Sequence, residues 1–112
     1  MCNDRTSLEQ SLKHREGRLN KEKRYHQLMQ EDYEQISSKS ERFLNDVSEL
    51  MRNSEERYFF QDLESQHYQT TQKVRTYFQE EEAYLRQKEQ RLEDDKEHLQ
   101  RLKKKEEDKD GR

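Results

Sequence analysis

The sequence predicts an all-α protein, a two-helix antiparallel hairpin that packs like a coiled coil. Three observations predict it: a composition with no Pro and 2 Gly, two heptad patterns of apolar residues, and a short polar break between them. Of the 112 residues, 44% are charged and 26% are hydrophobic, whereas globular domains contain roughly 45–50% apolar residues. A core of several layers is therefore excluded. Long helices that bury one narrow stripe fit the composition better than the alternative, a disordered chain.

The first predicted helix covers residues 6–52 and follows a flexible N-terminus at residues 1–5. Its apolar residues alternate in steps of four and three, which is the pattern of a coiled-coil seam. The apolar members of this first seam are Leu8, Leu12, Leu19, Met29, Tyr33, Ile36, Phe43, Val47 and Leu50. Its polar members are Arg15, Glu22, His26 and Ser40. We expect the seam to face a second helix.

The second helix is predicted at residues 55–102, after a turn at residues 52–55. Asn53 and Ser54 are good N-cap residues, and Asn53 with Glu56 has the spacing of a capping box. The second seam comprises Phe60, Thr71, Val74, Phe78, Leu85, Leu92, Leu99 and Leu102, with polar members Glu64, His67, Glu81, Lys88 and Asp95. Residues 103–112 are expected to form a disordered charged tail.

Folding the chain at the turn pairs the two seams when the paired residue numbers sum to 110 or 111. The expected apolar pairs are Leu8/Leu102, Leu12/Leu99, Leu19/Leu92, Tyr33/Phe78, Ile36/Val74 and Leu50/Phe60, and the polar pairs are Arg15/Asp95, Glu22/Lys88 and Ser40/Thr71. Matched polar pairs are a means by which coiled coils fix their register. An antiparallel homodimer of two unbroken helices would make the same contacts and stays open as an alternative.

Apolar residues outside the seams predict a binding surface for another protein. We expect this surface to be formed by Tyr25, Leu28, Leu63, Tyr77 and Tyr84, which lie on one flank of the hairpin. Tyr suits interfaces because it combines a large apolar area with a polar tip. A two-helix domain is also close to the limit of stability, so added helices would supply missing burial. The alternative is that these side chains only widen the seam.

No group of residues predicts an enzyme, a metal site or a cofactor. Glu64 and His67 have the spacing of a di-iron motif, but the first helix offers no matching pair. The net charge of −3, with both signs interleaved, gives no reason to expect nucleic acid as a partner, and no apolar run predicts insertion into a membrane. The lone Cys2 cannot form a disulfide within the chain, although an intermolecular bridge stays open, and a reducing cytoplasmic location is the simplest interpretation.

The predicted hairpin resembles the WXG100-type proteins of type VII secretion in bacteria. It is more similar to the LXG-associated α-helical (Lap) proteins, second subfamily, through residues 57–64, the Gln-rich segment up to Val74 and the acidic residues 80–82. That resemblance implies an adaptor, or targeting chaperone, that binds the N-terminal helical domain of an LXG toxin together with a second small helical hairpin, and that is either cytoplasmic or secreted with the toxin. The alternative function is a structural coiled-coil homo-oligomer without a role in secretion.

Two features of those families are absent from this sequence. It has no Trp-x-Gly at the turn, and it lacks the Phe-x-x-x-Asp export motif of the first Lap subfamily. The sites most like an export motif are Tyr58 with Asp62 and Phe78 with Glu82. The sequence therefore favours a toxin-binding adaptor over the carrier of the export signal.

Overall fold

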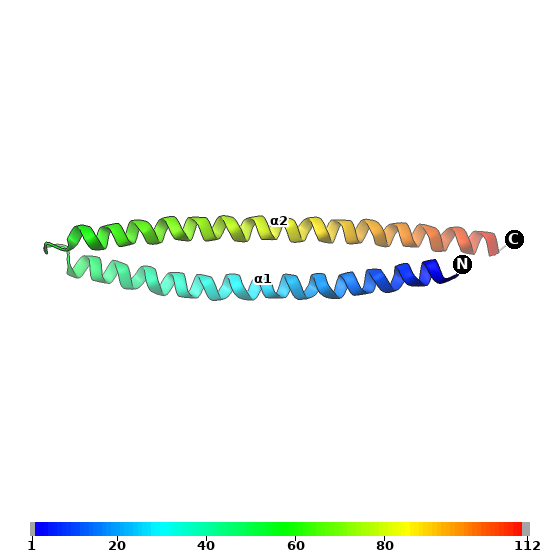
Figure 1. Cartoon of the computed structure of the whole chain (residues 1–112), viewed down its shortest axis with the longest axis horizontal. Helices are drawn as coiled ribbons and strands as arrows, with labels where there is room; N and C mark the ends of the chain where they lie inside the picture. The colour runs from blue at the N-terminus through cyan, green and yellow to red at the C-terminus, as the bar shows by residue number, and fades with distance from the viewer. Residues whose placement is uncertain (1, 111–112) are drawn as a thin grey trace. The chain divides into compact units, whose positions relative to one another are not determined.

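The computed structural model describes residues 2–110 and confirms the two-helix antiparallel hairpin. Helix α1 covers Cys2–Leu50 and helix α2 covers Arg57–Asp110, with the turn at residues 51–56 (Figure 1). The alternative of two unbroken helices is wrong, because one chain turns back on itself at this point. The absence of Pro throughout the chain and the many Glu, Gln, Lys, Arg and Leu residues account for helices of this length.

The turn includes the predicted residues 52–55, but its hydrogen bonds differ from the expected capping box. The backbone N–H and the hydroxyl of Ser54 both donate to the carbonyl oxygen of Met51, at 3.0 and 2.8 Å. These bonds satisfy a carbonyl at the C-terminal end of α1, which otherwise lacks a helical partner. Because α2 begins at Arg57, Asn53 is too far from the helix start to be its N-cap, contrary to the prediction.

The helices also extend further than the sequence predicted at both ends. Residues 2–5 belong to α1 and residues 103–110 to α2, so both helices are longer than predicted, and the flexibility of the two ends stays a prediction. Residues 1, 111 and 112 lie outside the described part of the chain. Two ion pairs connect the helices in these ranges: Arg5 pairs with Glu106, and Lys103 Nζ lies 2.7 Å from Glu9 Oε1.

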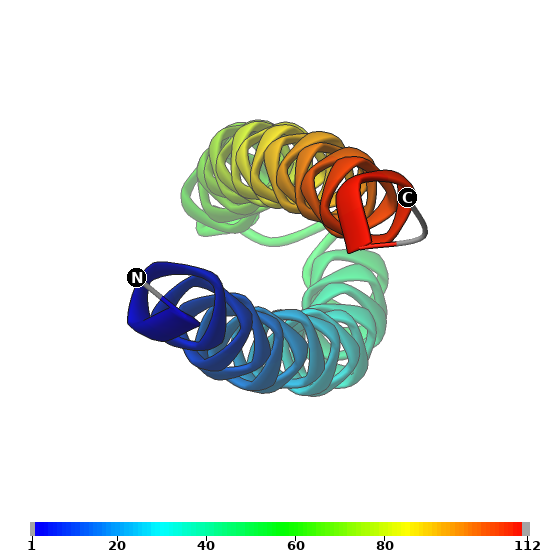
Figure 2. The ribbon, with the colours of Figure 1, turned by 90° about the vertical axis from the view of Figure 1, so that its right-hand side faces the viewer.

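The hairpin divides into two compact units, each built from one segment of α1 and one of α2. Unit 1 contains Met1–Tyr25 and Glu82–Arg112, and unit 2 contains His26–Glu81 with the turn. Within unit 1, the N-terminal segment of α1 and the C-terminal segment of α2 lie side by side in both views of the ribbon (Figure 1 and Figure 2). The two units differ in what they bury, and this difference locates the candidate site.

Candidate partner-binding surface

Unit 1 has an apolar core between its two helix segments. Five leucines are at most 8% exposed and form one cluster, against which Leu8 packs: Leu12, Leu19, Leu85, Leu92 and Leu99. Charged pairs flank this cluster at the predicted positions, with Arg15 Nη1 2.6 Å from Asp95 Oδ2 and Lys88 Nζ 3.0 Å from Glu22 Oε2. The sequence therefore predicted the register of this unit correctly.

Further ion pairs cross between the helices of unit 1. Lys23 Nζ lies 2.9 Å from Glu89 Oε1, and Lys96 Nζ lies 3.2 Å from Glu16 Oε2. Hydrogen bonding to Glu16 raises the pKa of Lys96. Unit 1 thus pairs both its apolar and many of its charged side chains within itself.

A second lysine of unit 1 connects the ion pairs to a tyrosine. Hydrogen bonding to Glu22, and secondarily to Tyr84, raises the pKa of Lys88. The Nζ atom of Lys88 also lies 4.7 Å from the centre of the Tyr84 ring, within the range of a cation–π interaction. This lysine therefore has favourable partners on both helices of the unit.

Unit 2 buries mainly polar groups where unit 1 buries leucines. Its buried side chains are Ser37, Thr71 and Phe78, and the hydroxyls of Ser37 and Thr71 lie 3.3 Å apart. Three buried polar atoms, His26 Nε2, His67 Nε2 and Ser48 Oγ, have no hydrogen-bond partner. Since an unpaired buried polar group costs about 1–3 kcal/mol, the seam of unit 2 stabilises the hairpin less than the seam of unit 1.

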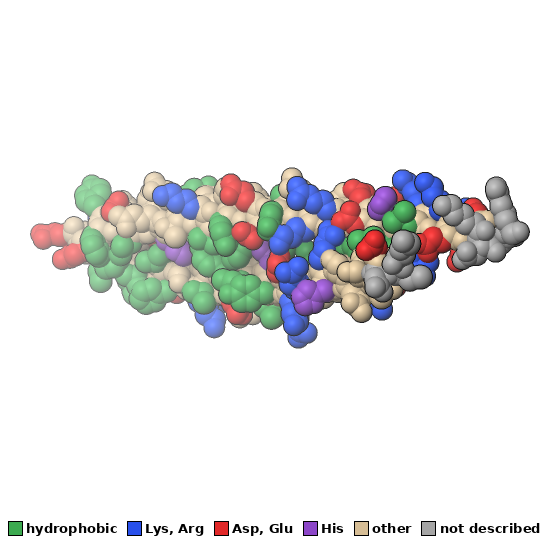
Figure 3. Space-filling view, turned by 45° about the vertical axis from the view of Figure 1, so that its right-hand side comes forward, with side chains coloured by type: hydrophobic (Ala, Val, Ile, Leu, Met, Phe, Trp, Pro, Cys, Tyr) green, Lys and Arg blue, Asp and Glu red, His purple; other side chains and the backbone are tan. Residues whose placement is uncertain are grey.

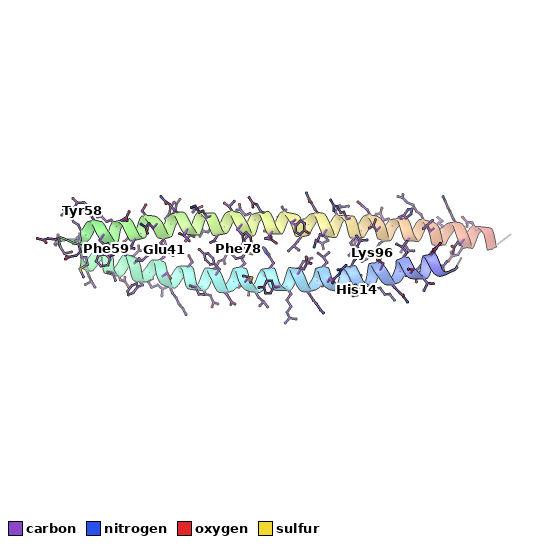
Figure 4. All side chains as sticks on the ribbon, viewed as in Figure 1. His14, Glu41, Tyr58, Phe59, Phe78 and Lys96 are labelled. Carbon is purple, nitrogen blue, oxygen red and sulfur yellow. The ribbon has the colours of Figure 1, made fainter. Side chains whose placement is uncertain are left out.

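An aromatic cluster lies between the helices of unit 2. The buried Phe78 ring lies 5.9 Å from the Tyr33 ring and 5.6 Å from the His26 ring, measured between centroids, and Figure 4 labels Phe78 between the helices. The predicted pair Tyr33/Phe78 is confirmed. His26, a polar member of the predicted seam, meets the edge of the Phe78 ring.

The seam of α1 in unit 2 differs from the prediction by one residue. Four residues assigned to the seam, spaced seven apart, are exposed: Met29 (44%), Ile36 (64%), Phe43 (66%) and Leu50 (81%). The residues that follow each of them are buried or half-buried instead: Gln30, Ser37, Leu44 and Met51. The expected contacts of Ile36 with Val74 and of Leu50 with Phe60 are therefore wrong, and Ser37 rather than Ser40 bonds to Thr71.

The seam of α1 differs by one residue because two successive spacings between its inward positions are four residues long. After residue 26, the next inward residue of α1 is residue 30, whereas a strict heptad would make residue 29 the next inward residue. An ideal α-helix drifts by about 20° per heptad, and an inserted step of four absorbs this drift. The pattern of α2 keeps the predicted inward positions from Phe60 to Leu99, including Thr71, Phe78 and Leu85, whereas Leu102, predicted to pair with Leu8, is 36% exposed.

The displaced residues of α1 share one side of unit 2 with apolar residues of α2. Each of them directly precedes an inward residue, and so do Phe59, Leu63 and Tyr77 on α2. In an antiparallel hairpin, the same offset from the seam on both helices leads to the same side. We call this set the apolar face: Met29, Ile36, Phe43, Leu50, Phe59, Leu63 and Tyr77.

The opposite side of unit 2 supports this geometry. A groove there is lined by residues that directly follow inward residues on both helices, among them Glu41, Asn45, Tyr68 and Gln72. Residues at the same offset from the inward positions of α1 and α2 therefore lie on the same side of the unit. This groove is more polar than the apolar face, and Leu44 and Tyr68 are its apolar members.

The predicted partner-binding residues are mostly exposed but belong to different units. In unit 2, Leu28 is 49% and Tyr77 55% exposed, and Leu63 is half-buried. In unit 1, Tyr25 is 66% and Tyr84 51% exposed. The sequence-based set missed four exposed residues of α1 in unit 2, because their sevenfold spacing was interpreted as the seam itself: Met29, Ile36, Phe43 and Leu50.

The residues that resemble an export motif lie in contrasting environments. Tyr58 is exposed near the turn (Figure 4), where Arg57 Nη2 donates to its hydroxyl at 2.9 Å, and Asp62 accepts from Gln66 at 2.9 Å. Phe78 is only 7% exposed, so its ring is not available to a partner of the folded hairpin. In unit 1, Glu82 pairs with Arg86 at 3.1 Å.

The face seen in Figure 3 shows hydrophobic side chains gathered over unit 2, while Lys, Arg, Asp and Glu are more frequent over unit 1. Among the side chains that the structure describes, those of residues 4–108, no group of three or more His, Cys, Asp or Glu is arranged to hold a metal ion. No helix in that range has a stretch apolar enough to cross a membrane. The side chain of Cys2 lies outside the described part of the chain.

Comparisons with known proteins identify no relative. No family model matches the sequence, and neither a curated protein nor a solved structure is significantly similar to it. The candidate site is therefore defined by its own geometry, an exposed apolar face on the unit with the more polar seam.

Proposed function

We propose that this protein is a non-enzymatic adaptor that binds helices of another protein through unit 2. The apolar face carries this proposal, because six of its seven members are exposed: Met29, Ile36, Phe43, Leu50, Phe59 and Tyr77. Scattered exposed apolar residues are ordinary, whereas a set gathered on one side marks an interaction site. The sevenfold spacing on α1 matches the way in which helices pack along each other.

The partner that we propose is the N-terminal helical domain of an LXG toxin, which the adaptor would accompany to type VII secretion. Support comes from the resemblance of residues 57–64 and 80–82 to Lap proteins, and from the two-helix hairpin that those proteins share. A second small hairpin protein would complete the complex. The weak seam of unit 2 also supports partner binding, because helices packed on this unit would add the apolar burial that its interior lacks.

Co-expression with the product of a neighbouring LXG gene tests this function. We expect a complex that survives affinity purification and gel filtration. Tyr77→Asp should weaken it, because the charged side chain would need to be buried against the partner. Tyr68→Asp is the matched control, since Tyr68 is exposed on the opposite side of the same unit. A toxin that never copurifies, with the adaptor monomeric and stable alone, would refute the proposal.

The rival function is a structural coiled-coil homo-oligomer that uses the same face. Multi-angle light scattering of the isolated protein distinguishes the two functions. The adaptor is expected to gain mass only when its partner is added. A tight dimer or tetramer of the isolated chain, unaffected by the toxin domain, would favour the structural role.

A further inference from the structure

From the charge of unit 2 we infer that the helix seated on the apolar face is amphipathic and flanked by Lys and Arg. This inference rests on the proposed function and defines the chemistry of the partner. Between residues 26 and 81 the chain has 6 basic and 12 acidic residues, a net charge of −6, whereas unit 1 has 17 basic and 14 acidic residues, a net charge of +3. The apolar face thus lies on the acidic unit.

Residues beside the apolar face carry a smaller net charge of the same sign, −1 from three acidic and two basic side chains. On α1, Asp32 and Asp46 are exposed one helical turn from members of the face, with Lys39 between them. On α2, Glu80 lies in the equivalent position, with Lys73 one heptad before it. Charge complementarity between partners raises the association rate and suppresses binding of like-charged competitors. A helix with basic flanks is therefore favoured over one with acidic flanks.

A second copy of this chain is a poor occupant of the apolar face, whether it binds through its unit 2 or through its unit 1. Two copies of unit 2 would match apolar surfaces but bring two charges of −6 together. Unit 1 of another copy has the opposite charge, but four of its six residues at the equivalent offset from the seam are polar: Ser11, Arg18, Arg91 and His98, beside Tyr25 and Tyr84. A different protein that combines apolar and basic residues on one helix satisfies both requirements.

The dimensions of the face set the length of the occupant. From Met29 to Leu50, α1 rises by roughly 32 Å at 1.5 Å per residue. A partner helix of about 20 residues covers this distance. Its apolar residues would repeat in steps of three and four, so that they pack between the columns of α1 and α2.

Three synthetic peptides of about 20 residues test the inference with the full-length protein. The basic and acidic peptides share one apolar heptad stripe and differ only in their flanks, Lys and Arg in one and Glu in the other. The third peptide has the basic flanks but Gln in place of the apolar stripe. Fluorescence anisotropy at two salt concentrations measures their affinities.

We expect the basic peptide to bind at least about tenfold more tightly than the acidic peptide. Raising the salt concentration should reduce the difference in affinity between the basic and acidic peptides, because screening weakens the attraction between the basic peptide and unit 2. The Gln peptide should bind at least about tenfold more weakly than the basic one, since charge alone does not fill an apolar face. Equal affinities for the basic and acidic peptides would overturn the inferred charge preference, as would weak binding of all three.

Two variants locate the binding site. Phe43→Ala should reduce the affinity for the basic peptide by at least about tenfold, whereas Tyr68→Ala, a ring of equal exposure (66% each) on the other side, should leave it within about twofold. Equal losses of affinity in both variants would show that the peptide does not bind at the apolar face. These outcomes are independent of copurification with the toxin: a toxin complex without peptide selectivity refutes the inference alone, and selectivity without a toxin complex refutes only the proposed partner.

Discussion

Units 1 and 2 are built from the same two helices but distribute apolar residues in opposite ways. In unit 1 the leucines face inward and the residues just before them are largely polar, such as Arg18 and Arg91. In unit 2 the inward positions include Ser37 and Thr71, while Ile36 and other apolar residues face outward. The difference shows that the two halves of one hairpin can differ in role: one half stabilises the fold, and the other exposes an apolar surface.

The largest expected effect tests the stabilising role of unit 1. Leu92→Ala should lower the free energy of unfolding by about 2–5 kcal/mol, because Leu92 is 4% exposed within the leucine cluster. Urea denaturation followed by circular dichroism measures this loss. Native-state hydrogen exchange should also show stronger protection in unit 1 than in unit 2. A change below about 0.5 kcal/mol would show that the leucine cluster does not determine stability.

A smaller effect of opposite sign tests the polar seam of unit 2. His67→Leu should stabilise the isolated protein by about 1 kcal/mol, because it removes a buried nitrogen without a partner and adds apolar burial. His14→Leu, at an exposed position of unit 1 (Figure 4), is the control and should change stability little. Both variants are compared by thermal denaturation. Destabilisation by His67→Leu would mean that the imidazole supports the seam.

How far the sequence could predict the molecule differs between the units. In unit 1, leucines and opposite charges recur in matched columns, so Arg15/Asp95 and Glu22/Lys88 were found from spacing alone. In unit 2, two neighbouring columns of α1 both contain apolar residues, one with Ile36 and Phe43, the other with Leu44 and Met51. A rule that places apolar residues inside selects the first column, but the extra step of four selects the second.

The wrong choice of column on α1 also affected the predicted binding surface. Tyr77 was identified from sequence because it lies outside the seam of α2, whose pattern is regular. The matching residues of α1 were not identified, because an exposed apolar column looks like a seam when no second helix is placed beside it. Only the packing of α1 against α2 separates the two cases.

A still smaller effect is expected on the apolar face itself. Phe43→Ser should change the free energy of unfolding by no more than about 0.5 kcal/mol, since the ring is 66% exposed and loses little burial. The solubility of the isolated protein should rise, because an exposed apolar patch promotes association. Denaturation and sedimentation velocity provide both measurements. A large destabilisation would place Phe43 in the core, as the simple heptad pattern predicted.

The smallest effect concerns the ion pairs of unit 1 and depends on pH. The hydrogen bond from Lys103 lowers the pKa of Glu9, so the pair contributes stability above about pH 4.5, the ordinary pKa of this group, and loses it as the pH falls through the lowered value. Lys88 and Lys96 have raised pKa values, so their contribution is present at neutral pH and disappears only as the pH rises through those values. Glu9→Gln should therefore flatten the acid side of a plot of stability against pH, because the variant has no carboxylate to protonate at this position. An acid side as steep as that of the wild-type protein would show that the pair with Lys103 contributes no stability.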